Sequence, residues 1–334
     1  MRSLFLALLL AGCDDDEPTP TPKDAATDTP SDTAVTTGTP PDGDPATVEL
    51  AGECDLDKDY GGFTVEIVNS ENLSYSTVAG EIANGVVPVT ILQPVVAEGD
   101  CELLQRLNPF CDPPCQAGET CDFDSTCISF PVNQDLGTVS VAGLKVPVTM
   151  DPVPPGNNYF EIQLPHPVFQ PGVLIEATSS GTTFGADFSL HGVGVDRMDV
   201  GSATEWIITD GLDLNVTWTP STAVPARAHV HLRLNIDQHG NTPVQVFCEF
   251  EDDGEGTVPA ALITRLIGFG VTGFPNGALT RRTVDQATMA DGCIDFEVRS
   301  EAAPSVRVDG FIPCNSSKDC PEGQTCDPVS FICN

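Results

Sequence analysis

The stretch AHVHLRLNIDQHGNTPVQVFCEFE, residues 228–251, contains two runs in which apolar and polar residues alternate. The first run spans 230–236 and the second spans 244–250. Because successive side chains of a strand point to opposite faces, a period of two predicts a strand with one buried face. The residues between the runs, Gln238-His239-Gly240-Asn241, are typical of a turn. The stretch therefore predicts a β-hairpin.

The same alternation recurs along the chain, at 63–67, 139–141, 160–164, 212–218 and 293–298. Only 259–267 has a helical pattern, with Pro259 at its first turn. We therefore predict an all-β fold: a β-sandwich of Greek-key or jelly-roll type over residues 49–310, with Trp218 in its core. A division into two sandwiches near residues 136–155 is the alternative.

The composition limits what the protein binds. Its 334 residues include 14 Lys and Arg against 49 Asp and Glu, which gives a formal net charge of −35. Such a surface repels phosphate groups, so we expect no nucleic-acid partner. The chain also has 30 Gly, 29 Pro and 13 Cys. Gly and Pro favour turns between short strands, and the cysteines favour an oxidising compartment.

The N-terminal residues 1–12 have the pattern of a signal peptide. A basic start at Arg2 precedes an apolar run, 4–10, that is too short to span a bilayer. The tetrad Leu10-Ala11-Gly12-Cys13 that follows resembles the bacterial lipobox. The resemblance implies that Cys13 is acylated and becomes the new N-terminus, which would attach the protein firmly to a membrane. The alternative is an ordinary secretory signal in which Cys13 later enters a disulfide.

Residues 13–48 have the composition of a solvated tether. They are rich in Asp, Thr and Pro, and Lys23 is their one basic residue. A segment with so few apolar residues cannot bury enough surface to offset the entropy of ordering it. We expect a disordered, extended spacer between the anchor and the body.

Eight cysteines form two clusters that share a pattern. Cys115-Gln-Ala-Gly-Glu-Thr-Cys121-Asp122 aligns with Cys320-Pro-Glu-Gly-Gln-Thr-Cys326-Asp327. The clusters are completed by Cys111 and Cys127 and by Cys314 and Cys333. The second copy resembles the Dickkopf-type N-terminal cysteine-rich module, which implies an extracellular, disulfide-bonded unit used for protein contacts. The first copy departs from that module in the spacing of its first two cysteines.

We expect these clusters to form two small disulfide-rich cassettes, an insertion at 101–130 and a C-terminal unit at 311–334. Of the three pairings that four cysteines allow, we predict first-to-third and second-to-fourth in each cassette. The clusters contain no Cys-x2-Cys pair and no nearby His, so zinc is not expected.

Four cysteines remain outside the clusters: Cys54, Cys101, Cys248 and Cys293. Cys248 and Cys293 lie in two strongly alternating runs, so we expect a disulfide between those two strands. Cys54 with Cys101 then follows by elimination.

Two patterns suggest a metal site, and each has a simpler interpretation. Asp55, Asp57, Asp59 and Glu66 have the oxygen spacing of a calcium loop, but the glycine that such a loop needs comes one residue late, at Gly61. An acidic loop that enters a strand explains the pattern better.

His229 and His231 would share one face of a strand, where they could chelate a metal. We favour an exposed polar strand face for both. His239, next to Asp237, fits a hairpin turn.

The sequence contains no usable Gly-x-Ser-x-Gly, Ser-x-x-Lys or phosphate-loop motif, so we assign no catalytic, cofactor-binding or metal-binding residue. We predict a lipid-anchored, non-enzymatic binding or adhesion module of the cell envelope, at the outer membrane or cell surface. Its partner would be an envelope or extracellular protein or a glycan, and the acidic surface allows weak binding of divalent cations. The alternatives are an envelope hydrolase acting on glycans or peptides and a calcium-dependent adhesion domain.

Overall fold

The computed structural model describes residues 41–69, 74–88, 91–106, 110–182, 187–201, 205–224, 227–236, 244–289 and 292–334. Within them the fold is all-β, with α1 (Ala260–Gly268) as the only helix. The strands are β1 (Asp59–Asn69), β2 (Ser74–Ile82), β3 (Leu92–Glu98), β4 (Cys101–Arg106), β5 (Glu119–Cys121), β6 (Cys127–Ser129), β7 (Val139–Ala142), β8 (Val148–Met150), β9 (Tyr159–Glu161), β10 (Leu174–Ser179), β11 (Phe188–Val193), β12 (Glu205–Ile208), β13 (Leu214–Thr217), β14 (His229–Asn235), β15 (Val244–Glu251), β16 (Glu255–Val258), β17 (Asn276–Met289), β18 (Gly292–Ala302) and β19 (Ser305–Val308).

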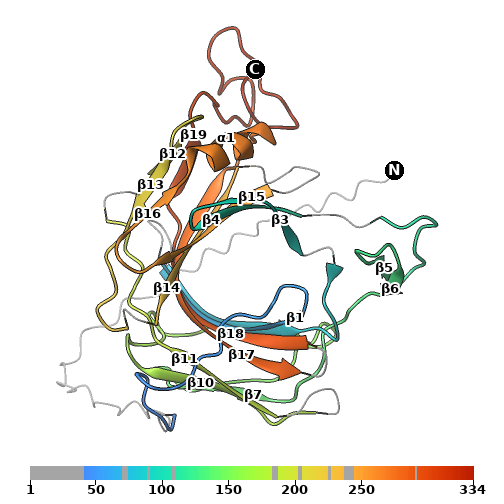
Figure 1. Ribbon diagram of the computed structural model, residues 1–334, viewed down its shortest axis with the longest axis vertical. Coiled ribbons are helices and arrows are strands. Elements are labelled where there is room, and N and C mark those ends of the chain that lie inside the picture. Colours follow the sequence, from blue (N-terminus) through green and yellow to red (C-terminus); the bar gives the residue numbers. More distant parts are fainter. Residues whose placement is uncertain are drawn as a thin grey trace, which may run out of the picture. The chain divides into compact units, whose positions relative to one another are not determined.

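One eleven-stranded sheet forms the centre of the fold (Figure 1). Its main path runs β3-β4-β15-β14-β17-β18-β1-β2-β9, and β12 and β19 join it beside β17. The long strands β17 and β18 pair antiparallel, whereas β18 and β1 pair in parallel. The sheet is continuous from β3 to β9, so the structure has one body rather than two separate sandwiches.

A second layer covers one half of this sheet. The four-stranded sheet β11-β10-β7-β8 packs on β1, β17 and β18 through a core that includes Phe63, Val65, Phe169, Leu190 and Phe296. Phe63 and Val65 on β1 and Phe296 on β18 alternate with less buried residues along their strands, as the period of two predicts. The sandwich predicted from the sequence is therefore confirmed.

The other half of the sheet is covered by the β13–β16 pair and by α1, which lies where the sequence predicts it. Val230, Leu232 and Val246 pack in this second core with Leu262 and Ile263 from the helix. The predicted pair of strands on either side of residue 240 is also confirmed, because β14 and β15 are antiparallel neighbours. The turn between them, with His239 and Asp237, lies outside the described residues.

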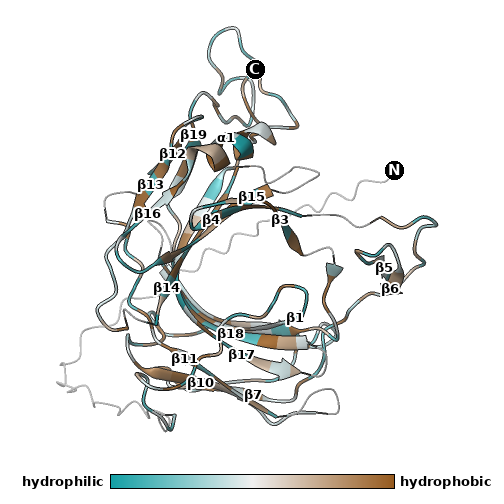
Figure 2. Cartoon of the chain, viewed as in Figure 1, coloured by the Kyte–Doolittle hydropathy of each residue, from teal (hydrophilic) through white to brown (hydrophobic). Residues whose placement is uncertain are grey.

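Trp218 is buried as predicted, with 6% of its surface exposed, and stacks on Phe250. Both cores lie on the same face of the large sheet. The opposite face, which we call the inner face, turns toward the inside of the curve in Figure 1. Figure 2 shows the mixture of hydrophilic and hydrophobic residues along β14, β17 and β18 that results from this alternation.

Six disulfides join the twelve cysteines from Cys54 to Cys333, and in the two cassettes they follow the predicted pattern. The bonds are Cys111–Cys121, Cys115–Cys127, Cys314–Cys326 and Cys320–Cys333. The first cassette begins after β4, later than expected, because Cys101–Arg106 is a strand of the large sheet. The second cassette inserts Ile332 into the core beside α1 and packs Phe331 on Phe274.

The other two predicted disulfides are wrong. The structure pairs Cys54 with Cys293 and Cys101 with Cys248. Strand order explains the difference, because β4 is the neighbour of β15 and brings Cys101 opposite Cys248. The segment before β1 likewise brings Cys54 to β18, where Cys293 is in register with Asp59. Neither adjacency follows from alternation within single strands.

Candidate functional site

A ladder of ion pairs crosses the inner face of the large sheet. Glu297 and Arg299 project from β18, Glu66 from β1 and Arg282 from β17. Arg299 contacts Glu66 at 2.7 Å and Glu297 at 2.8 Å, and Arg282 contacts Glu297 at 3.5 Å. Arg282 also contacts Glu53 at 2.7 Å, on the segment before β1. The inner face is thus a charged surface that faces neither core.

Glu249 on β15 lies between the two histidines of β14. Its carboxylate is 3.2 Å from Nδ1 of His229 and 3.6 Å from Nε2 of His231. The interaction with His231 is the main cause that lowers the pKa of Glu249 to about 2. Glu249 is therefore an anion at any physiological pH.

The prediction that both histidines lie on an exposed strand face holds for His229 but is wrong for His231. The side chain of His229 is 50% exposed, whereas that of His231 is 7% exposed. Phe247 packs edge-on against His231, and Arg282 lies against its Nε2. Burial lowers the pKa of His231 and the nearby Arg282 lowers it further, so its ring is neutral at pH 7.

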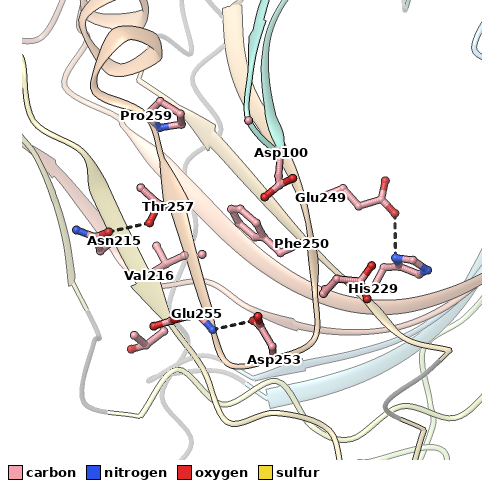
Figure 3. A pocket seen from close by; sticks show the side chains of 14 residues that line it. Asp100, Asn215, Val216, His229, Glu249, Phe250, Asp253, Glu255, Thr257 and Pro259 are labelled. Carbon is pink, nitrogen blue, oxygen red and sulfur yellow. Dashed lines mark hydrogen bonds and ion pairs between the residues drawn. The ribbon is translucent and has the colours of Figure 1, made fainter.

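Three cavities meet at Glu249. The β16 cavity, of about 830 Å³, lies between the β13–β16 pair and β15, and its carboxylates are Asp100, Glu249, Glu251, Asp253 and Glu255. Figure 3 shows it with the His229–Glu249 contact at one end and the Asn215–Thr257 hydrogen bond along another wall. Lys and Arg are absent from the residues described along its walls.

The β4 cavity, of about 810 Å³, continues from Glu249 toward β4 and adds Glu53, Asp55 and Glu102. We call these two cavities together the acidic groove. The small cavity, of about 400 Å³, lies on the other side of Glu249 and is lined by Leu50, Gly52, Glu53, Arg227, His229, Glu249, Arg282 and Val284.

Asp295 is the most perturbed carboxyl group of the inner face. Burial, with the charges of Asp59 and Glu53, raises its pKa to about 7. It accepts a hydrogen bond from the backbone N–H of Cys54 at 2.9 Å. Cys54, Asp59 and Asp295 come close enough to hold a metal ion. Because Cys54 is in a disulfide, it is not a thiolate, and two carboxylates remain as ligands.

The residues with calcium-loop spacing do not form a loop. Asp59 to Asn69 is the extended strand β1, which places Glu66 roughly 20 Å beyond Asp59 at about 3.3 Å per residue. Glu66 is paired with Arg299, and Asp55 with Lys58 at 3.1 Å. The interpretation as an acidic segment that enters a strand is confirmed.

The structure also reveals a hydrogen-bonded chain that no motif indicated. Ser76 Oγ lies 3.0 Å from Nδ1 of His166, and Nε2 of His166 lies 3.1 Å from Oδ1 of Asn69. This arrangement resembles that of a nucleophile (Ser76), a general base (His166) and a group that orients the base (Asn69). However, Ser76 is only 2% exposed, so its hydroxyl is out of reach of a substrate. We interpret these two hydrogen bonds as contacts that hold the loop around His166 on the β1–β2 hairpin.

Cys13, the predicted lipid-attachment residue, lies outside the described residues. Among the residues that are described, no helix is both long and apolar enough to cross a bilayer. No known protein family matches the chain, and no curated protein is significantly similar to it.

Proposed function

We propose that the protein is a lipid-anchored binding module of the cell envelope and that its inner face, around Glu249, is the binding surface. The observation that carries the proposal is the convergence of three cavities on this single carboxylate. Carboxylates line the acidic groove without a Lys or Arg among the residues described there. Such a groove favours a polar, positively charged part of a protein or glycan partner.

The anchoring part of the proposal is supported by the sequence at Cys13 and by the six disulfides. Disulfides persist in oxidising compartments outside the cytoplasm. A diacylated N-terminal cysteine followed by a Pro-rich tether would hold the sheet at a distance from the membrane surface.

Cys13→Ala is expected to abolish incorporation of labelled palmitate, because the acylated sulfur is removed. Fluorography of the immunoprecipitated protein measures it. The Cys320→Ala/Cys333→Ala variant, which removes a disulfide-bonded pair, is the matched control and retains the label. Equal labelling of parent and Cys13→Ala would refute the anchor.

For the acidic groove, fluorescein-labelled hexalysine is the probe, with the mature chain purified in detergent. Glu249→Gln/Glu251→Gln is expected to weaken its binding about tenfold, because each partly exposed charge pair contributes up to about 1 kcal/mol. Raising the salt concentration should weaken binding to the parent in the same direction. Fluorescence anisotropy measures both effects.

The control for this experiment is Glu322→Gln/Asp309→Asn, which removes the same amount of charge from exposed positions outside the groove. It should leave the affinity within about twofold of the parent. If both double variants weaken hexalysine binding equally, the affinity reflects net charge alone and the acidic groove is not the binding surface.

One observation favours a second candidate, an envelope glycan hydrolase. Asp295, with its pKa near 7, and Glu297, which is paired with arginines, lie two residues apart on the same strand face. Glycosidases use a pair of carboxyl groups in which the general acid has a raised pKa, and Asp295 fits that role. An assay for reducing ends released from envelope glycans separates the two candidates, since a binding module releases none.

A further inference from the structure

The small cavity differs from the acidic groove in the balance of charge along its walls. Its walls, around about 400 Å³, carry Arg227 and Arg282 as well as Glu53 and Glu249. The protein carries 14 basic residues in all, and two of them line this cavity. In a chain with a net charge of −35, this local neutrality indicates a ligand that differs from the one the acidic groove would attract.

Arg282 is the buried cation of the cavity. Its side chain is 9% exposed, and its guanidinium contacts Glu53, Glu297 and His231. Its Nε has no hydrogen-bond partner in the described part of the chain. The Glu297 contact is long, at 3.5 Å, and the neutral ring of His231 brings no charge. Arg282 also lines the cavity, and a carboxylate is the best match for the geometry of a guanidinium.

Glu249 is the available anion of the same cavity. Its side chain is 52% exposed, so it is accessible from the solvent, unlike Arg282. Its direct partners are the two histidines rather than an arginine or lysine. An ammonium group would therefore find an ionised carboxylate there that contacts two histidines directly and Arg282 only through its more distant charge.

We propose that the small cavity binds a zwitterion of amino-acid to dipeptide size, with its carboxylate toward Arg282 and its ammonium group toward Glu249. The volume is at the lower end of the range for small-ligand sites, which fits such a ligand. Val284 and Leu50 supply an apolar wall for its side chains. The inference rests on the binding role proposed for the inner face and names the ligand class of one part of it.

Calorimetric titration of the mature chain in detergent with the dipeptide Ala-Ala tests the proposal. N-acetyl-Ala-Ala and Ala-Ala amide each lack one of the two charges, and we expect each to bind at least tenfold more weakly than the free dipeptide. Equal affinity for either blocked form, or no heat with the free dipeptide at millimolar concentration, would overturn the proposal.

Variants locate the site. Arg282→Gln should weaken Ala-Ala binding at least tenfold while hexalysine affinity stays within about twofold. Because Arg282 is buried and its loss could disturb the sheet, Val284→Phe provides a second variant that fills the cavity and keeps every charge. It should also weaken Ala-Ala binding at least tenfold.

Arg307→Gln, at a half-exposed arginine outside the cavity, is the matched control and should bind like the parent. Unchanged dipeptide binding in Val284→Phe would place the zwitterion elsewhere and refute the site. If the parent protein binds the dipeptide but does not bind hexalysine, the result would refute the proposed role of the acidic groove and leave the proposal for the small cavity intact.

Discussion

Asp252→Ala is expected to lower the free energy of unfolding by about 3–5 kcal/mol, because it leaves a fully buried arginine without its counter-ion. The side chains of Asp252 and Arg281 are both 0% exposed, and they form two parallel hydrogen bonds of 2.7 and 2.9 Å. Asp252 also accepts hydrogen bonds from the indole of Trp218 and the backbone of Ser221. Urea denaturation followed by tryptophan fluorescence measures the loss.

Two controls separate the buried charge from simple loss of contacts. Asp252→Leu/Arg281→Met removes both charges and should cost less than either single substitution, because no unpaired charge stays in the core. Glu205→Ala breaks an exposed ion pair, to Arg307, and should cost less than about 1 kcal/mol. A loss of under 1 kcal/mol in Asp252→Ala would show that water or another residue reaches Arg281.

This buried pair fastens several loops to the core-facing side of the sheet. Arg281 lies on β17, at 0% exposure, and donates to the backbone carbonyls of Asp196, Arg197 and Thr219. It therefore joins the loop after β11, the loop after β13 and the end of β15. The sequence did not indicate this role, because two adjacent arginines are typical of an exposed surface. The alternation of β17 places Arg281 on the core face of the sheet and Arg282 on the inner face.

The strands could be predicted from the sequence because alternation is a local property. The runs at 63–67 and 293–298 lie within strands, the run at 230–236 extends one residue past β14, and the helix begins one residue after Pro259. The run at 160–164 is wrong in part, because β9 ends at Glu161. What could not be predicted is which strands are neighbours. The parallel pairing of β1 with β18 joins residues more than 200 positions apart, and no local pattern encodes it. The two disulfides were predicted wrongly because the order of the strands in the sheet was not known.

The candidate site could likewise be predicted only where it depends on a single strand. The sequence shows the alternation that places His229 and His231 on one strand face, and it shows the large excess of Asp and Glu. The burial of His231 depends on Arg282 and Phe247, which come from the two strands beside β14. The cavities around Glu249 depend on the β13–β16 pair and on the segment before β1. A site assembled across strands becomes visible only when the strand order is known.

The disulfide between Cys101 and Cys248 should make a large covalent contribution to stability, and it can be removed without leaving a polar group in the core. Its two cysteines are 147 positions apart in sequence, so the bond restricts the unfolded chain severely. The chain-entropy account gives about 5 kcal/mol for a loop of this length and about 3 kcal/mol for one near 15 residues.

We therefore expect Cys101→Ala/Cys248→Ala to reduce the free energy of unfolding of the body by about 5 kcal/mol in urea denaturation under non-reducing conditions. Alanine is chosen because both positions are buried. Cys320→Ala/Cys333→Ala removes a bond that spans only 13 positions, within the C-terminal cassette, and should cost about 3 kcal/mol or less. If the two double variants lost the same stability, loop length would not set the contribution. The pairing of β4 with β15 would then be stable without its covalent link.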